Sequence, residues 1–267
     1  MRKASVLVPV AATLVGIVIG AVAFHGLASH SLSAVGAAAP ARDARQPPAP
    51  PAAQTGEAVL KQFHQIWYSA PWTWLKNRWL GIPAEQNPMD AWIIQEIMFD
   101  TKPDFMIECG SFLGGGAALW ATLLDQVNPA ARVISIDIED KMAEARRLPI
   151  VERKVEFLIG SSTSPAILEK VKERVRGKKV LVLLDSDHRA PHVLEEIRAY
   201  APLVPVGGYL IVQDGNINGH PVRPDYGPGP YEAIHEFLRG NDSFTIDKSR
   251  ERMMFTFSPD GFLKRTK

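Results

Sequence analysis

The stretch DFMIECGSFLGGGAALWATLLDQV, residues 104–127, decides the fold of this chain. It opens with a short apolar run that ends in the acid Glu108, passes through a glycine-rich turn, and continues from Gly114 to Val127 with helical spacing. A buried strand that leads directly into a helix is the repeating unit of a parallel sheet covered by helices on both faces. The stretch therefore predicts the first strand and helix of such a sheet.

The same alternation continues to the C-terminus. Further buried strands are expected, in chain order, at 132–137, 155–160, 179–185 and 207–214. Helices are expected after them at 141–147, from Ser164, from Pro191 and at 231–239. Two closing strands, 244–247 and 253–257, are joined by the charged turn SRER without a helix, which predicts an antiparallel edge. We therefore expect a Rossmann-like, doubly wound α/β domain with a mostly parallel sheet and an antiparallel edge strand.

The chain before this domain divides into three segments. Residues 1–30 hold an apolar run from Ala4 to Ser29, long enough to cross a hydrocarbon core, and we expect it to be an uncleaved membrane anchor. A cleavable signal peptide is the competing interpretation. Residues 31–55 are rich in Ala and Pro, which is typical of an extended linker. Residues 56–100 predict a helical cap, and residues 101–267 the α/β domain.

Two arguments disagree about the side of the membrane on which the domain lies. Arg2 and Lys3 precede the apolar run, and the positive-inside rule would then send the rest of the chain outside. Arg42 and Arg45 follow on the other side and weaken this bias. The cofactor predicted below from the strand ends is a cytosolic metabolite, which favours the cytoplasmic side.

Composition excludes one class of partner and one kind of crosslink. Thirty Lys and Arg residues nearly balance 29 Asp and Glu residues, without a basic stripe, so nucleic acid is not an expected partner. Cys109 is the single cysteine, which rules out an internal disulfide, and its apolar neighbours predict a buried thiol. Assembly into a homo-oligomer is left open.

A tryptophan-rich stretch, PWTWLKNRWLG, lies in the predicted cap and contains Trp72, Trp74 and Trp79. Aromatic side chains of this kind also gather at membrane interfaces. The linker separates them from the apolar run, so we expect a cap or pocket wall packed on the main domain.

The carboxyl ends of the first two strands carry the pattern of a cofactor site, because ligands of open parallel sheets bind there. Glycines after the first strand let a ligand approach the backbone, and Asp137 can accept hydrogen bonds from ribose hydroxyls. The dinucleotide pattern G-x-G-x-x-G is not met, and Glu108 would repel a pyrophosphate but favour a donor with an amino group and a sulfonium. We therefore predict S-adenosylmethionine, bound by Glu108, Gly110, Ser111, Gly114, Gly115, Asp137, Ser161 and Asp185.

Oxygen-bearing side chains follow the fourth and fifth strands of the predicted sheet. They read Asp185-Ser-Asp187-His188 and Gln213-Asp214, and such oxygens are the ligands that Mg²⁺ prefers. A magnesium ion there would lower the pKa of an acceptor hydroxyl. We predict a metal site formed by Asp185, Asp187, Gln213 and Asp214. His188 is the predicted proton acceptor, with Asp185 also counted as catalytic.

The loop 216–230 that follows, NINGHPVRPDYGPGP, is long and rich in Gly and Pro, which is typical of a lid over a site. His220, Arg223 and Tyr226 could contact substrate there. His192 is interpreted as a residue of the first turn of a helix.

Five segments stand in a familiar order: WLGIPAEQNPMDAWIIQEIMFDTKPDFMIECGSFLGGGAALWA, LLDSDHRAPHVLEEI, GGYLIVQDGNINGHPV, GPGPYEAIHEFL and RERMMFTFSPDGFLKR. Together they resemble the cephalosporin hydroxylase family, which includes rhamnosyl O-methyltransferases and has the class I methyltransferase fold. The resemblance implies the same roles for Glu108, Gly110, Asp137 and Asp185. It also implies that an acidic pair at the fifth strand end helps to bind Mg²⁺. Here that pair reads Gln213-Asp214, so a weaker magnesium site is expected.

The expected function is methyl transfer from S-adenosylmethionine to a hydroxyl of a sugar or other polyhydroxylated compound, associated with the cell envelope or with secondary metabolism. A nicotinamide-dependent oxidoreductase is one alternative, and the missing glycine pattern opposes it. The other is a membrane-tethered binding protein that kept the fold and lost its metal, which the amide at Gln213 would favour.

Overall fold

The computed structural model describes residues 56–267, which belong to one compact unit. The predicted membrane anchor and the linker lie outside the described residues. Within residues 56–267, no helix combines the length and the apolar character that crossing a membrane requires.

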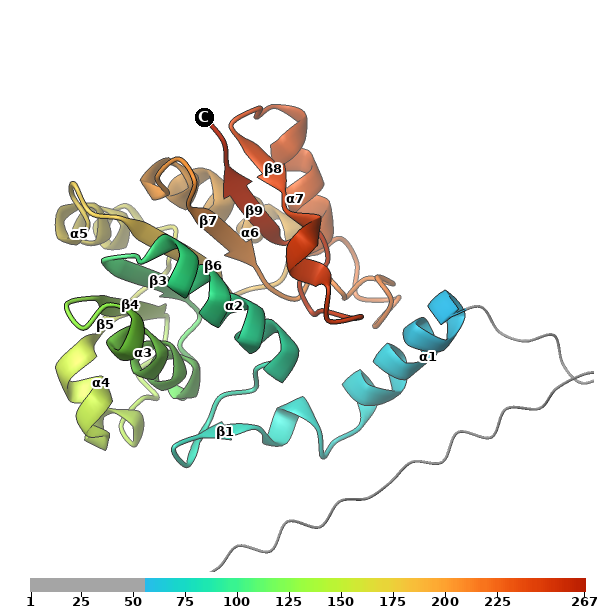
Figure 1. The fold of residues 1–267 in the computed structure, drawn as a ribbon, viewed down its shortest axis with the longest axis horizontal. Helices are drawn as coiled ribbons and strands as arrows, with labels where there is room; N and C mark the ends of the chain where they lie inside the picture. Colours follow the sequence, from blue (N-terminus) through green and yellow to red (C-terminus); the bar gives the residue numbers. More distant parts are fainter. Residues whose placement is uncertain (1–55) are drawn as a thin grey trace, which may run out of the picture. The chain divides into compact units, whose positions relative to one another are not determined.

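A seven-stranded sheet forms the centre of the unit, in the order β5–β4–β3–β6–β7–β9–β8 (Figure 1). Its first five strands in sheet order are parallel, and β9 pairs antiparallel with both β7 and β8. The prediction of a mostly parallel sheet with antiparallel pairing at one end is confirmed. The strands are β3 (Phe105–Cys109), β4 (Arg132–Asp137), β5 (Val155–Ile159), β6 (Val180–Leu184), β7 (Tyr209–Val212), β8 (Phe244–Ile246) and β9 (Phe262–Arg265).

Helices cover both faces of the sheet because alternate residues of each buried strand point to opposite sides. Met106 packs with helices α2 (Pro88–Thr101) and α3 (Gly115–Val127), and its neighbour Ile107 packs with the helices of the other face. Cys109 is fully buried there, as expected. The helices of that second face are α5 (Pro165–Arg174), α6 (Ala190–Tyr200) and α7 (Pro230–Arg239).

Two predicted elements are wrong. Residues 253–257 form no strand, because Phe255 and Phe257 pack against rings of the cap, and the last strand is β9 further along the chain. The helix expected at 141–147 is only a single 3₁₀ turn, Ala145–Arg147. Pro149 then starts a separate short helix, α4 (Pro149–Lys154), because proline begins a helix readily but cannot continue one.

Residues 88–100 of the predicted cap lie in α2 and pack on the sheet, so the name cap is kept for residues 56–87. The cap consists of α1 (Gly56–Ser69), a 3₁₀ turn at Trp74–Lys76 and a small hairpin of β1 (Arg78–Trp79) and β2 (Ile82–Pro83). From α1, the buried His64 packs on Phe255 and Phe257 and forms a hydrogen bond of 3.0 Å with Asn216. These contacts fasten the cap to the loop that follows β7. The cap is therefore an integral wall of the domain.

The start of α2 ties the cap to the segment before β9. Asn87 caps the helix by accepting from the Met89 amide, and Pro88 occupies its first position. Asp90 is almost fully buried and accepts a hydrogen bond of 2.8 Å from the Phe257 amide. Burial raises the pKa of Asp90 to about 7, although hydrogen bonds from Thr256 and Phe257 oppose the shift.

The buried Asp90 makes a testable contribution to the pH dependence of stability. An unfolded aspartate releases its proton near pH 4 and the folded one near pH 7, so its contribution to the free energy of unfolding falls as pH rises between these values. Asp90→Asn keeps an acceptor for the Phe257 amide and removes this loss. Between pH 5 and pH 8, the free energy of unfolding of the variant, measured in urea, should rise by on the order of 2–4 kcal/mol relative to that of the wild type.

The control for this measurement is Asp225→Asn, the same substitution at an exposed position. Parallel pH profiles for Asp90→Asn and the wild type would contradict the assignment.

Candidate functional site

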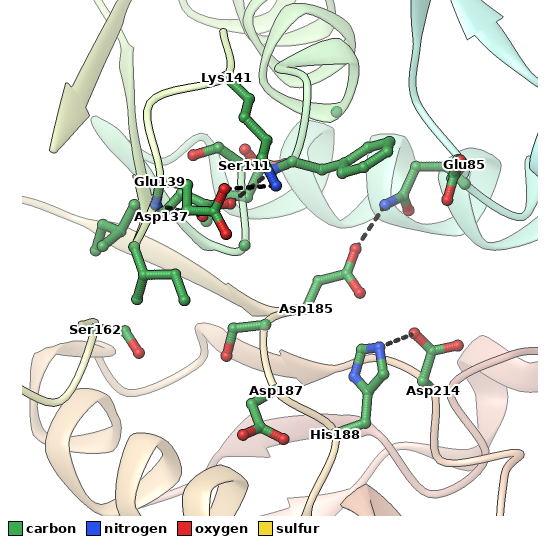
Figure 2. A pocket seen from close by; sticks show the side chains of 18 of the residues that line it. Glu85, Ser111, Asp137, Glu139, Lys141, Ser162, Asp185, Asp187, His188 and Asp214 are labelled. Carbon is green, nitrogen blue, oxygen red and sulfur yellow. Dashed lines mark hydrogen bonds and ion pairs between the residues drawn. The ribbon is translucent and has the colours of Figure 1, made fainter. Parts of the chain in front are cut away.

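A cavity of about 580 Å³ opens at the carboxyl ends of β3, β4, β6 and β7 (Figure 2). The order of the sheet reverses between β3 and β6, because the chain runs outward through β4 and β5 before it returns to β6. Ligands of doubly wound sheets bind at such a reversal. The cavity therefore lies where the sequence places its candidate residues.

The glycine turn brings two strand ends together. Gly110 has a φ of +98°, and a Cβ on it would overlap the backbone carbonyl oxygen of Asp185. The Asp185 amide in turn donates to the Cys109 carbonyl at 2.8 Å. A glycine is required here by both conformation and space.

The remaining glycines of the turn have separate roles. The structure places Gly114 against Ala145 and Met142, and Gly115 against the Pro83 carbonyl of the cap, outside the cavity wall. Gly116 does line the cavity, where a Cβ would meet the Glu108 carboxylate. The predicted ligand contacts of Gly114 and Gly115 thus correspond to close packing, and Gly116 is a wall residue that the sequence pattern did not single out.

Glu108 lies in the wall but is already hydrogen-bonded by the protein. It is 1% exposed, and its carboxylate accepts from the Trp120 indole at 2.8 Å and from the Ser135 hydroxyl. Ser111, also predicted to bind the cofactor, pairs with Ser135 at 2.6 Å. Burial raises the pKa of Glu108 to about 7 despite these donors. The Glu108 carboxyl group therefore lies next to Gly116, with its oxygens already hydrogen-bonded by the protein.

Asp137 shapes the next part of the wall. Its carboxylate accepts from the backbone amides of Phe112 at 2.8 Å and Glu139 at 3.0 Å, and it faces the cavity (Figure 2). Phe112 and Ile138 are exposed and line the same cavity. Two apolar side chains beside a carboxylate suit a flat ring attached to a ribose.

Serine residues after β5 complete this end of the cavity. The predicted Ser161 lines it and lies 3.2 Å from the Thr163 hydroxyl. Its neighbour Ser162, which the sequence did not single out, donates to the buried Glu196. His192 also lines the cavity from the first turn of α6, and its hydrogen bond to Glu196 raises its pKa.

Three predicted residues come together at the ends of β6 and β7. Asp185, His188 and Asp214 each offer a ligand atom, and these atoms lie within 4.8 Å of one another. The His188 Nε2 is 3.3 Å from an Asp214 carboxylate oxygen (Figure 2). Asp214 has a φ of +54°, a left-handed backbone that positions its side chain at some conformational cost.

This cluster fits a divalent cation on electrostatic grounds. Burial raises the pKa of Asp185 well above its usual range, and the nearby carboxylates of Asp214 and Glu108 raise it further. Carboxylates held this close repel each other, and a bound cation would remove the repulsion. The chemistry of the donor set therefore agrees with the predicted magnesium site.

The side chains of the two other predicted metal ligands are already bonded to other residues of the protein. Asp187 lines the cavity, but its carboxylate pairs with Arg189, whose hydrogen bonds lower the pKa of Asp187 to about 2. Gln213 is buried, and its side-chain amide pairs reciprocally with that of Gln86. Asp187 does not belong to the compact cluster of ligand atoms, whereas Gln213 is linked to Asp185 through the Gln86 amide.

Gln86 is a further site residue that was not predicted from the sequence. It comes from the cap, between β2 and α2, and its amide nitrogen donates to an Asp185 oxygen at 2.9 Å. The Gln213 amide donates to the Gln86 oxygen at 2.7 Å, so Gln86 links Asp185 to Gln213. No spacing signal could reveal this contact, because 99 residues separate Gln86 from Asp185.

The predicted lid contributes two residues, Ile217 and Arg223, to the wall. Arg223 lines the cavity, and Tyr226 packs against its guanidinium, 4.9 Å from the ring centroid. His220 is turned to Glu232, at 2.9 Å, and is not a wall residue. Glu232 also accepts from Asn218 and from the Gly229 amide, so both ends of the loop are tied to the start of α7.

Comparison with known proteins identifies close relatives. The family described as Rhamnosyl O-methyltransferase/CmcI matches residues 72–266. Rhamnosyl O-methyltransferases of Mycobacterium tuberculosis and Mycobacterium bovis are each 39% identical over 217 residues, which cover 78% of this chain and 86% of theirs. The enzyme of the same name from Mycobacterium leprae is 36% identical over 215 residues, covering 78% and 91%.

Two solved structures of CmcI share the fold. The apo-structure has a TM-score of 0.54 and 17% identity, and covers 72% of this chain and 77% of that one. The structure with Mg and SAM has a TM-score of 0.55 and 18% identity, and covers 76% and 84%.

The link between Gln86 and Asp185 predicts an effect on cation binding. Gln86→Leu removes the donor that stabilises the charged form of Asp185, so the carboxyl should hold its proton more tightly and compete less well for a cation at pH 7. Calorimetric titration with Mg²⁺ should show an affinity several-fold below that of the wild type. The control is Gln95→Leu on α2, which lines a separate cavity. Equal affinities for wild type and Gln86→Leu would refute the role of Gln86.

Proposed function

The chain belongs to the rhamnosyl O-methyltransferase/CmcI family and is an S-adenosylmethionine-dependent O-methyltransferase, and we propose that it methylates a sugar hydroxyl with the help of a divalent cation. The observation that carries the proposal is the arrangement of one cavity. The glycine turn and Asp137 lie in its wall together with the cluster of Asp185, His188 and Asp214.

The donor would occupy the part of the cavity near the glycine turn. S-adenosylmethionine supplies an electrophilic methyl group. Asp137 is placed to accept hydrogen bonds from ribose hydroxyls, and Phe112 and Ile138 offer apolar surface to the adenine ring. Gly110 and Gly116 keep the backbone accessible, and the carboxyl groups of Glu108 and Asp185 line the same cavity, where they would face the donor's amino and sulfonium groups.

The acceptor hydroxyl would be activated at the cluster. A divalent cation bound there would lower the pKa of an acceptor hydroxyl. Asp185 and Asp214 are the residues that would hold the ion, with Gln213 as a neutral neighbour that contributes no charge. His188 would take the proton from the hydroxyl, and the nearby Asp214 carboxylate would orient its ring and stabilise the charged form.

The names of the relatives support a sugar acceptor and oppose the oxidoreductase alternative. Curated relatives that cover most of this chain are named rhamnosyl O-methyltransferases, which supports a deoxysugar or similar polyhydroxylated ring as acceptor. Hydride transfer is not favoured, because the relatives are methyltransferases and the dinucleotide glycine pattern is absent from the turn.

We propose further that the apolar run within residues 1–30 attaches the enzyme to a membrane. The proposal rests on the length of the run alone. Reporter fusions at the C-terminus would decide between the two orientations that the sequence predicts.

Methyl transfer itself is testable with the full-length chain. Methyl α-L-rhamnopyranoside and isotopically labelled S-adenosylmethionine should give a methylated product, and EDTA should abolish the reaction. His188→Gln should lower kcat about 100-fold or more, as expected for loss of a general base, with donor affinity unchanged by calorimetry. Donor binding without transfer to any sugar would reject the acceptor, and activity insensitive to EDTA would reject the cation.

A second test addresses the amide at Gln213. Gln213→Glu adds a third carboxylate beside Asp185 and Asp214, so calorimetric Mg²⁺ affinity should rise about tenfold or more at pH 8. Gln126→Glu, on the separate cavity beside α3, adds the same charge without approaching the cluster and should leave Mg²⁺ affinity unchanged. Unchanged affinity in Gln213→Glu would mean that the ion binds beyond the reach of this side chain.

A further inference from the structure

Two aromatic side chains of the cap form a corner in the wall of the cavity. Tyr68 lies in the last turn of α1, Trp74 starts the 3₁₀ turn that follows, and both line the cavity. The Trp74 indole donates to the Tyr68 carbonyl at 2.8 Å, and the ring centroids are 5.2 Å apart. Both rings also pack on Phe257, at 5.3 and 5.6 Å. The positions of the two rings are therefore fixed by their contacts with Phe257.

Polar groups border this aromatic corner. Burial raises the pKa of Tyr68, the nearby Asp214 carboxylate raises it further, and the Arg223 guanidinium, which also faces the phenol, lowers it. Arg223 is exposed, with a left-handed φ of +47°, and its guanidinium lies over the Tyr226 ring. The corner thus lies beside the cluster that would activate the acceptor, with a phenol and a guanidinium as hydrogen-bonding groups.

This combination matches the chemistry of a pyranose ring. Such a ring has an apolar C–H face and a rim of hydroxyls, so it needs an aromatic surface next to fixed polar groups. A planar aromatic acceptor would use the rings but offers fewer hydroxyls to Arg223 and the phenol than a pyranose does. The polar rim therefore favours the sugar.

We propose that Tyr68, Trp74 and Arg223 form the acceptor subsite and bind a pyranose ring. Its C–H face would rest on the two aromatic rings, and its hydroxyls would bond to the guanidinium and the phenol. The inference rests on the proposed function and adds to it the residues that select the acceptor. It also assigns a binding role to the cap, which contributes two of the three side chains.

The test separates acceptor binding from chemistry in the full-length enzyme. Saturation-transfer NMR with S-adenosylhomocysteine present measures binding of methyl α-L-rhamnopyranoside, and steady-state kinetics give KM and kcat. Trp74→Leu should abolish the NMR signal and raise KM at least tenfold, with donor affinity within twofold of wild type. Tyr68→Phe and Arg223→Gln should each raise KM several-fold, with a smaller effect on kcat.

Controls guard against a purely structural effect. Trp72→Leu, at a tryptophan that is 76% exposed and absent from the cavity wall, should leave KM unchanged. Trp74→Phe keeps an aromatic face and should retain most of the sugar binding, which keeps the test usable if Trp74→Leu unfolds.

Unchanged KM and NMR signal in Trp74→Leu would overturn the subsite, as would a wild type that binds no sugar. Binding of catechol instead, lost in Trp74→Leu, would replace the sugar with an aromatic acceptor. A wild type that binds the sugar without methylating it would reject the proposed function and leave the subsite standing.

Discussion

Gly110 lies against the backbone carbonyl of Asp185 so closely that no side chain fits between them, and the site is organised by this contact. It joins the end of β3 to the end of β6, the two strands between which the order of the sheet reverses. The glycine turn and the first acid of the cluster therefore lie in one cavity, although 75 residues of chain separate them. A Cβ at Gly110 would push the two strand ends apart, and a donor and an acceptor could no longer meet there.

The cap completes what the strand ends begin. The strand ends supply charged groups, which suit a cation and a sulfonium but do not define the shape of the acceptor site. The cap supplies Gln86, which holds the Asp185 carboxylate, and the aromatic pair of Tyr68 and Trp74. Buried His64, neutral because burial lowers its pKa to about 4, fastens this segment to Asn216 without adding a charge beside the acids. Charge at the site is thus set by the sheet and shape by the cap.

Elements whose structure is determined locally could be predicted from the sequence. The strand 132–137 was predicted with its observed bounds, because a buried parallel strand reads as an apolar run that ends at an acid. Asp185, His188 and Asp214 could be grouped because carboxyl ends of neighbouring strands must converge. The strand predicted at 253–257 is absent, since Phe255 and Phe257 pack on α1 and pair with no neighbouring strand. Contacts from the cap, such as that of Gln86, depend on the path of a long irregular segment and leave no local pattern.

The fastening of loop 216–230 by Glu232 has a consequence for recognition. A wall that is held at both ends by hydrogen bonds to one carboxylate has its shape before any ligand arrives. Little conformational entropy is then lost when a small molecule binds, so even a single sugar ring can be held by few contacts. The same rigid wall cannot adjust to bulkier rings. The enzyme would therefore select acceptors by their fit to a preformed surface.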